Sequence, residues 1–115
     1  MRLSPAAQVL APMAEAGTSV VDYLNGNILY INVMNRLSVD CDCDSSPAKP
    51  CMHDIGILAS YDPVALDQAC VDLVYAAEDG EKLVKRIESR NGLHTLEYAE
   101  KIGLGSRKYS LKSID

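Results

Sequence analysis

The chain has 115 residues, of which 48% are hydrophobic, and a formal net charge of −5. This length and hydrophobic content favour a single domain over residues 1–115 with a buried core. Lysine and arginine do not cluster, which argues against a nucleic-acid partner. No apolar run is long enough for a membrane span, and the N-terminus does not resemble a signal peptide, so we expect no membrane contact and a cytoplasmic location.

The first predicted element is a long helix. It begins at Ser4-Pro5, because serine is a suitable N-cap and proline fits the first helical turn. Apolar residues then recur at helical spacing until Asn25-Gly26, a typical helix end. Pro12 and Gly17 are expected to kink or split this helix.

The later elements are predicted from β-branched runs and helical spacing. They are strands at 27–34 and 55–59, helices at 63–77, 81–90 and 93–102, and a closing strand at 107–112. Asp62 and Asp79 are the expected N-caps of the first two of these helices. The order implies a small layered α/β domain, with about three strands and helices packed on the sheet. Three strands make a thin sheet, so a missing segment or a second copy is expected to complete it.

The segment DCDCDSSPAKPC, residues 40–51, holds three of the four cysteines. In an extended chain the thiols of Cys41 and Cys43 would lie about 6.6 Å apart, whereas two thiolates on one zinc ion lie roughly 4 Å apart. The loop must therefore bend, which its proline, serine and aspartate residues favour. Cys51, His53 and Asp54 are the further candidate ligands. Thiols in a cytosolic chain favour zinc or an iron-sulfur cluster, although this spacing matches no recognised site.

Two interpretations of this loop stay open. It is either a metal loop or a polar loop with incidental thiols. Redox chemistry is disfavoured, because Asp42 and its neighbouring aspartates raise the pKa of a nearby thiol and no Cys-x-x-Cys pair is present.

Three carboxylates form a second candidate constellation. Asp54 precedes the second predicted strand, Asp62 follows it, and Asp67 lies in the next helix. Carboxylates bind hard cations or act as acid and base. The simpler interpretation makes Asp62 a helix cap and gives Asp67 a structural hydrogen bond.

Five segments follow one another in a familiar order: YIN at 30–32, CDC at 41–43, DIGILAS at 54–60, DPVALDQACVDLV at 62–74 and LEYAEKIGLGSRKY at 96–109. Together they resemble the C-terminal part of the domain of unknown function 362 family. Many of its members are described as iron-sulfur center proteins and carry a ferredoxin-type module earlier in the chain. The resemblance implies a ferredoxin-like partner domain. It does not imply a ferredoxin-type cluster in this chain, which lacks the Cys-x2-Cys-x2-Cys-x3-Cys-Pro run.

The resemblance also extends to candidate site residues. Those that match the family pattern are Cys41, Asp42, Cys43, Asp54, Asp62 and Asp67. Cys51 and His53 do not match it.

Three functional hypotheses follow. The first is a non-enzymatic accessory domain that binds a metal ion through its cysteine loop. The second is part of an enzyme that uses the three carboxylates, with the rest of its site supplied by another domain or chain. The third is an interaction domain that forms a homo-oligomer.

Overall fold

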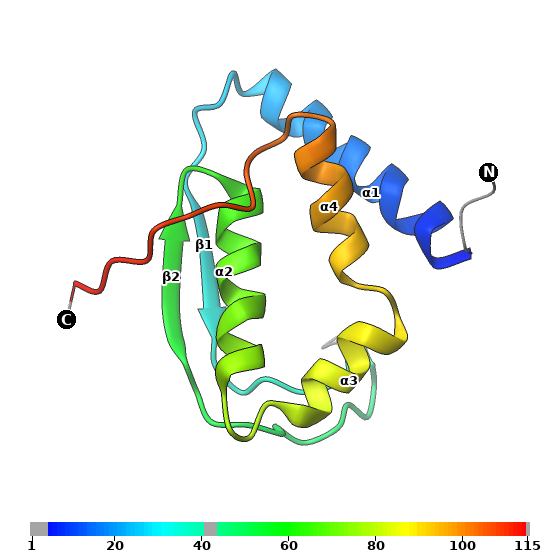
Figure 1. Cartoon of the computed structure of the whole chain (residues 1–115), viewed down its shortest axis with the longest axis vertical. Helices are drawn as coiled ribbons and strands as arrows, with labels where there is room; N and C mark the ends of the chain where they lie inside the picture. Colours follow the sequence, from blue (N-terminus) through cyan, green and yellow to red (C-terminus); the bar gives the residue numbers. More distant parts are fainter. Residues whose placement is uncertain (1–4, 41–43, 115) are drawn as a thin grey trace.

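The computed structural model describes residues 5–40 and 44–114 of the chain. Its elements are, in order, α1 (Pro5–Tyr23), β1 (Tyr30–Met34), β2 (Gly56–Ser60), α2 (Pro63–Ala76), α3 (Glu81–Ser89) and α4 (Leu93–Lys101). The described residues therefore form a small α/β domain of four helices and a two-stranded sheet (Figure 1).

The two strands are antiparallel and are covered on one face by α2. Tyr30 lies opposite Ser60, and Met34 lies opposite Gly56. One core fills the space between sheet and helix; its buried residues are Met34, Met52, Leu66, Cys70 and Val74. The β2–α2 connection is short because Asp62 caps α2 and Pro63 occupies its first turn.

A second core joins α1 and α4 to the first half of α2. Its buried residues are Ala14, Val64, Leu96 and Ala99. Small side chains at Ala14 and Ala99 let the two outer helices approach closely, and Figure 1 shows α1 crossing beside α4. The Tyr98 hydroxyl donates to the Glu15 carboxylate at 2.7 Å across this contact. The first and last helices are thereby held together.

The predicted closing strand at 107–112 does not form, so the expectation of about three strands is wrong for the described residues. The segment instead crosses α2 near its start and then extends away from it to the C-terminus (Figure 1), with Arg107 and Tyr109 hydrogen-bonded to α2. Its first N–H groups donate to side chains: that of Ser106 to Asp62 at 2.9 Å and that of Arg107 to Glu100 at 2.6 Å. Side-chain oxygens therefore take the backbone donors with which the segment begins, in place of a neighbouring strand.

Two expectations about helix ends and interruptions are also wrong. Pro12 and Gly17 do not split the first helix, which is continuous from Pro5 to Tyr23. Asp79 does not cap α3, whose N-cap is Gly80 without a side-chain hydrogen bond. The Asp79 carboxylate binds His53 instead.

The predicted helix stops are confirmed by backbone geometry. Asn25, Asn91 and Gly103 all have positive φ values of 53°, 51° and 83°. The residue after Asn91, Gly92, donates its N–H to the carbonyl of Ile87 at 2.8 Å, which satisfies one of the last carbonyls of α3. Among the described residues, no helix is long and apolar enough to span a membrane.

Candidate functional site

The cysteine-rich segment is closed at its base by two hydrogen bonds. The N–H of Cys51 donates to the carbonyl of Leu37 at 2.8 Å, and the N–H of Ala48 donates to Asp40 Oδ2 at 2.7 Å. The chain therefore leaves and re-enters the domain at one narrow stem. We call these four residues the loop stem.

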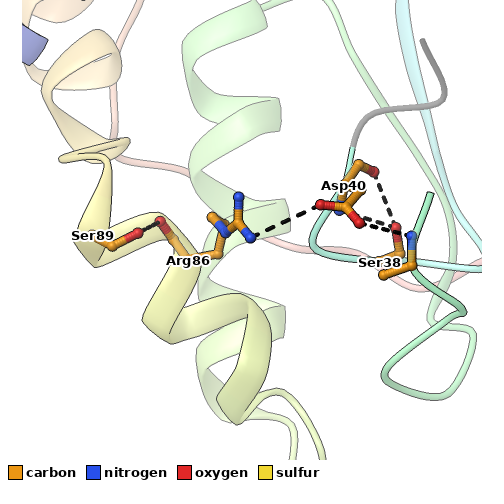
Figure 2. A network of polar contacts seen from close by, with 5 residues as sticks. Ser38, Asp40, Arg86 and Ser89 are labelled. Carbon is orange, nitrogen blue, oxygen red and sulfur yellow. Dashed lines mark hydrogen bonds and ion pairs between the residues drawn. The ribbon is translucent and has the colours of Figure 1, made fainter. Parts of the chain in front are cut away.

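The stem is also tied to α3 through Asp40, as Figure 2 shows. The hydroxyl of Ser38 accepts from the Asp40 N–H at 3.2 Å and donates to the Asp40 carbonyl at 3.0 Å. Arg86 on α3 places a guanidinium nitrogen 3.9 Å from Asp40 Oδ1 (Figure 2). In the next turn the Ser89 hydroxyl donates to the Arg86 carbonyl at 2.8 Å. A positive charge thus lies beside the Asp40 carboxylate at the loop stem.

Of the six candidate ligand and loop residues, the structure places three. Cys41, Asp42 and Cys43 lie outside the described residues. Cys51 is half-buried in the stem, and its thiol donates to the Leu37 carbonyl at 3.5 Å. His53 and Asp54 follow it directly. In the described part of the chain, no group of three or more histidine, cysteine or acidic side chains is arranged to hold a metal ion.

His53 pairs with Asp79, a residue that the sequence did not connect with it. The His53 N–H donates to Asp79 Oδ2 at 2.7 Å, and His53 Nδ1 lies 2.8 Å from Asp79 Oδ1. The backbone hydrogen bond, followed by the imidazole contact, lowers the pKa of the Asp79 carboxyl. A surface depression of about 550 Å³ lies beside the pair, with Leu73 in its wall. His53 therefore has a carboxylate partner outside the cysteine loop.

Asp54 and Asp62 lie at opposite ends of β2. Asp54 Oδ1 accepts the N–H of Arg36 at 2.8 Å and joins the ends of the two strands. Asp62 Oδ1 accepts from Val64 and Ala65 at 2.9 and 3.1 Å, which confirms the predicted N-cap. The five residues of β2 separate the two carboxylates by roughly 17 Å of strand.

Asp67 has the structural hydrogen bond that the sequence predicted, and its partner is Asn32 on β1. Asn32 Nδ2 donates to Asp67 Oδ1 at 2.8 Å and also lies 3.4 Å from Cys70 Sγ. Burial raises the pKa of the Cys70 thiol; the Asn32 contact lowers it, and the negative charge of Asp67 raises it. The described residues therefore do not bring Asp54, Asp62 and Asp67 into one cleft.

A chain of polar contacts fastens the C-terminal segment to α2. Gln68 is buried, and its amide oxygen accepts from Arg107 Nε at 2.8 Å. Its amide nitrogen donates to Asp72 Oδ1 at 2.9 Å, and the Tyr109 hydroxyl donates to Asp72 Oδ2 at 2.6 Å. The bond to Asp72 raises the pKa of Tyr109. Sequence analysis did not predict these hydrogen bonds. The one indication of them in the sequence is Gln68, a polar residue on the apolar side of a helix.

Comparisons with known proteins support the motifs as far as residue 72; the segment at 96–109 lies outside the matched residues. Residues 5–72 match the profile of the domain of unknown function family DUF362. The match runs from the start of α1 into α2 and includes both strands and the whole cysteine loop. Comparison with curated proteins and with solved structures gives no match. Since the matched residues make up more than half of the chain, this protein belongs to the DUF362 family, a domain of unknown function.

Proposed function

We propose that this chain is an accessory domain that binds zinc or iron through the thiols of its cysteine loop. The observation that carries the proposal is the loop stem. Cys41 and Cys43 belong to the short segment between Asp40 and Ala48, whose ends are joined by a hydrogen bond. Cys51 is part of the stem itself. All three thiols thus belong to one short loop, and loop closure reduces the entropy lost when they bind one ion.

The chemistry of the donors supports a thiophilic metal. Thiolates are soft ligands that favour zinc or iron-sulfur clusters over magnesium or calcium. Three aspartates and two thiols lie between residues 40 and 44, so a bound cation would offset a dense negative charge. Arg86, 3.9 Å from Asp40, contributes a single compensating charge at the stem.

Three thiols leave one position of a tetrahedral zinc site for another ligand. His53 and Asp54 fit this position less well, because Asp79 and the Arg36 N–H are already their partners. The ferredoxin-like partner domain expected from the family would be one source of the remaining ligand or of a cluster.

An accessory role is better supported than catalysis. Asp62 is occupied by three backbone N–H groups, and Asp67 by the Asn32 amide. Asp54 lies at the other end of β2. A catalytic pair of carboxylates needs a shared substrate position, and these residues do not converge on one.

Metal analysis with thiol titration tests the proposal. The protein is purified anaerobically without added metal, and zinc and iron are measured per chain. The wild type is expected to hold near-stoichiometric metal and to protect its loop thiols until a chelator is added. Cys41→Ser, Cys43→Ser and Cys51→Ser should each lose metal. Cys70→Ser is the matched control, because this thiol is buried on α2 away from the loop, and it should retain metal.

Two results would contradict the proposal. One is wild-type protein without metal and with freely reactive loop thiols. The other is metal that survives the combined Cys41→Ser and Cys43→Ser change. His53→Ala separates the ligand sets, since metal retained in that variant restricts the protein ligands to the thiols.

A further inference from the structure

The face of the sheet that points away from α2 is apolar and exposed. We call it the sheet face, and it consists of Leu29, Ile31, Val33, Ile57, Ala59 and Tyr61. Ile31 lies opposite Ala59, and Val33 lies opposite Ile57. Ile31, Val33 and Ile57 are 58%, 59% and 68% exposed. Large apolar side chains therefore form a ladder on the open side of the sheet.

This composition differs from that of a solvated sheet. Antiparallel sheets with one open face normally alternate apolar and polar residues, with the polar residues outside. Here neither strand contains a charged residue, and both faces of β1 and β2 carry apolar side chains. Such strands are typical of sheets that are covered on both faces, and α2 covers only one.

A second uncovered apolar surface lies on α1. Met13 and Val20 of α1, with Leu24 in the turn that continues it, are 57%, 57% and 42% exposed, and we call them the helix stripe. They lie one above another, because positions seven and eleven residues apart share a helix face. The only charged residues of α1 are Glu15 and Asp22. At 100° per residue both project about 180–200° away from Met13. The stripe is therefore uncharged, while the charges of the helix lie on its opposite side.

The two uncovered surfaces match in length and character. The helix stripe runs from residue 13 to residue 24, a rise of about 17 Å along a helix, and a five-residue strand is also about 17 Å long. Within one chain they are not in contact, since α1 packs on α4 and the sheet packs on α2. A helix laid across the sheet face would complete the second layer that the strand pattern predicts.

We propose that two copies of this chain associate reciprocally, with the helix stripe of each copy lying on the sheet face of the other. An exposed apolar side chain of this kind removes on the order of 60 Å² from water when it is covered. The nine side chains then bury roughly 500 Å² per copy and 1,000 Å² in total, the lower limit of a specific interface. The dimer is therefore concentration-dependent. Two-fold symmetry satisfies both surfaces of both copies.

Sedimentation equilibrium across a wide protein concentration range tests the dimer. The wild type should change from monomer to dimer as concentration rises. Val20→Asp on the stripe and Val33→Asp on the sheet face should each remain monomeric, because either places a charge in an apolar contact. Both positions are exposed, so circular dichroism should show intact folding. Ser19→Asp is the control, because it adds the same charge to α1 outside the stripe and should dimerise.

Mixing the two variants distinguishes the reciprocal arrangement from other contacts. Val20→Asp protein keeps its sheet face, and Val33→Asp protein keeps its helix stripe. An equimolar mixture should therefore associate more than either variant alone. A wild type that stays monomeric throughout would overturn the proposal. So would a Val20→Asp variant that dimerises like the wild type, which indicates a sheet-to-sheet contact, or a mixture without association.

Discussion

The carboxylate of Asp62 occupies the space beside Gly105 in which any other residue would carry its Cβ. One oxygen of this carboxylate caps α2 through Val64 and Ala65, and the other accepts the N–H of Ser106 at 2.9 Å. The close approach of the C-terminal segment to α2 therefore requires glycine at position 105.

Gly105→Ala is expected to lower the free energy of unfolding by about 1–2 kcal/mol, the usual cost of losing an N-cap. The added methyl group would clash with the Asp62 carboxylate and displace it from its donors. Chemical denaturation monitored by circular dichroism measures this change. Gly17→Ala is the control: its methyl group would meet only Leu104 Cδ2 at 3.6 Å, and alanine favours a helix by up to ~1 kcal/mol. Equal stability of the two variants would contradict this account.

Two substitutions separate the charge of Asp67 from its hydrogen bond. Asp67→Ala should cost about 0.5–1.5 kcal/mol, because it removes the bond from Asn32, whereas Asp67→Asn keeps an acceptor oxygen and should cost less. Both remove a negative charge that raises the pKa of Cys70, so in both variants that pKa should fall while the larger effect of burial stays. The rate at which the Cys70 thiol reacts, measured as a function of pH, gives its pKa. An unchanged Cys70 pKa in Asp67→Asn would show that the charge of Asp67 does not raise this pKa.

The His53–Asp79 pair predicts a dependence of stability on acid. Folding lowers the pKa of Asp79 below its ordinary value of 3.8, chiefly through the His53 N–H. The Asp79 carboxylate therefore stabilises the fold fully above pH 3.8, and this stabilisation is lost as the pH falls through the lowered pKa. The midpoint of chemical denaturation, measured at a series of decreasing pH values, should fall less steeply with pH in Asp79→Asn than in the wild type. His53→Ala keeps the backbone donor, so it should reduce the slope less than Asp79→Asn does.

Alkaline pH should break the Tyr109–Asp72 hydrogen bond and weaken the attachment of the C-terminal segment to α2. The hydrogen bond to Asp72 raises the pKa of Tyr109 above its ordinary value of 10.0. The bond therefore stabilises the fold fully below that value and is lost as the pH rises through the raised pKa. Tyr109→Phe should lose at most about 1 kcal/mol near neutral pH and should show a smaller alkaline loss than the wild type. Ultraviolet titration of the tyrosines, compared between the two proteins, identifies the shifted group.

Features that depend on neighbouring residues were predictable from the sequence. The cap at Asp62 and the helix stops at Asn25, Asn91 and Gly103 require only a few adjacent residues and their backbone preferences. Contacts between distant segments were not. The closing strand was predicted from alternation at 107–112, but the backbone N–H groups of Ser106 and Arg107, where the segment begins, donate to the side chains of Asp62 and Glu100.

The same limit applies to the candidate site. Asp79 looked like a helix cap because it precedes α3, yet its partner His53 lies 26 residues earlier. The partner of Asp67 is Asn32, which lies 35 residues away on β1. Residue type showed that each carboxylate needed a partner, but only the fold shows which one.

The pairing of α1 with α4 has a consequence for synthesis of the protein. Glu15 and Tyr98, which join these helices, are 83 residues apart. At about 5–20 residues per second, α1 leaves the ribosome roughly 4–17 s before the residue that binds it. During this time the surface of α1 that later packs on α4 is without its partner. A chaperone, or a neighbouring nascent chain, would meet α1 before α4 does.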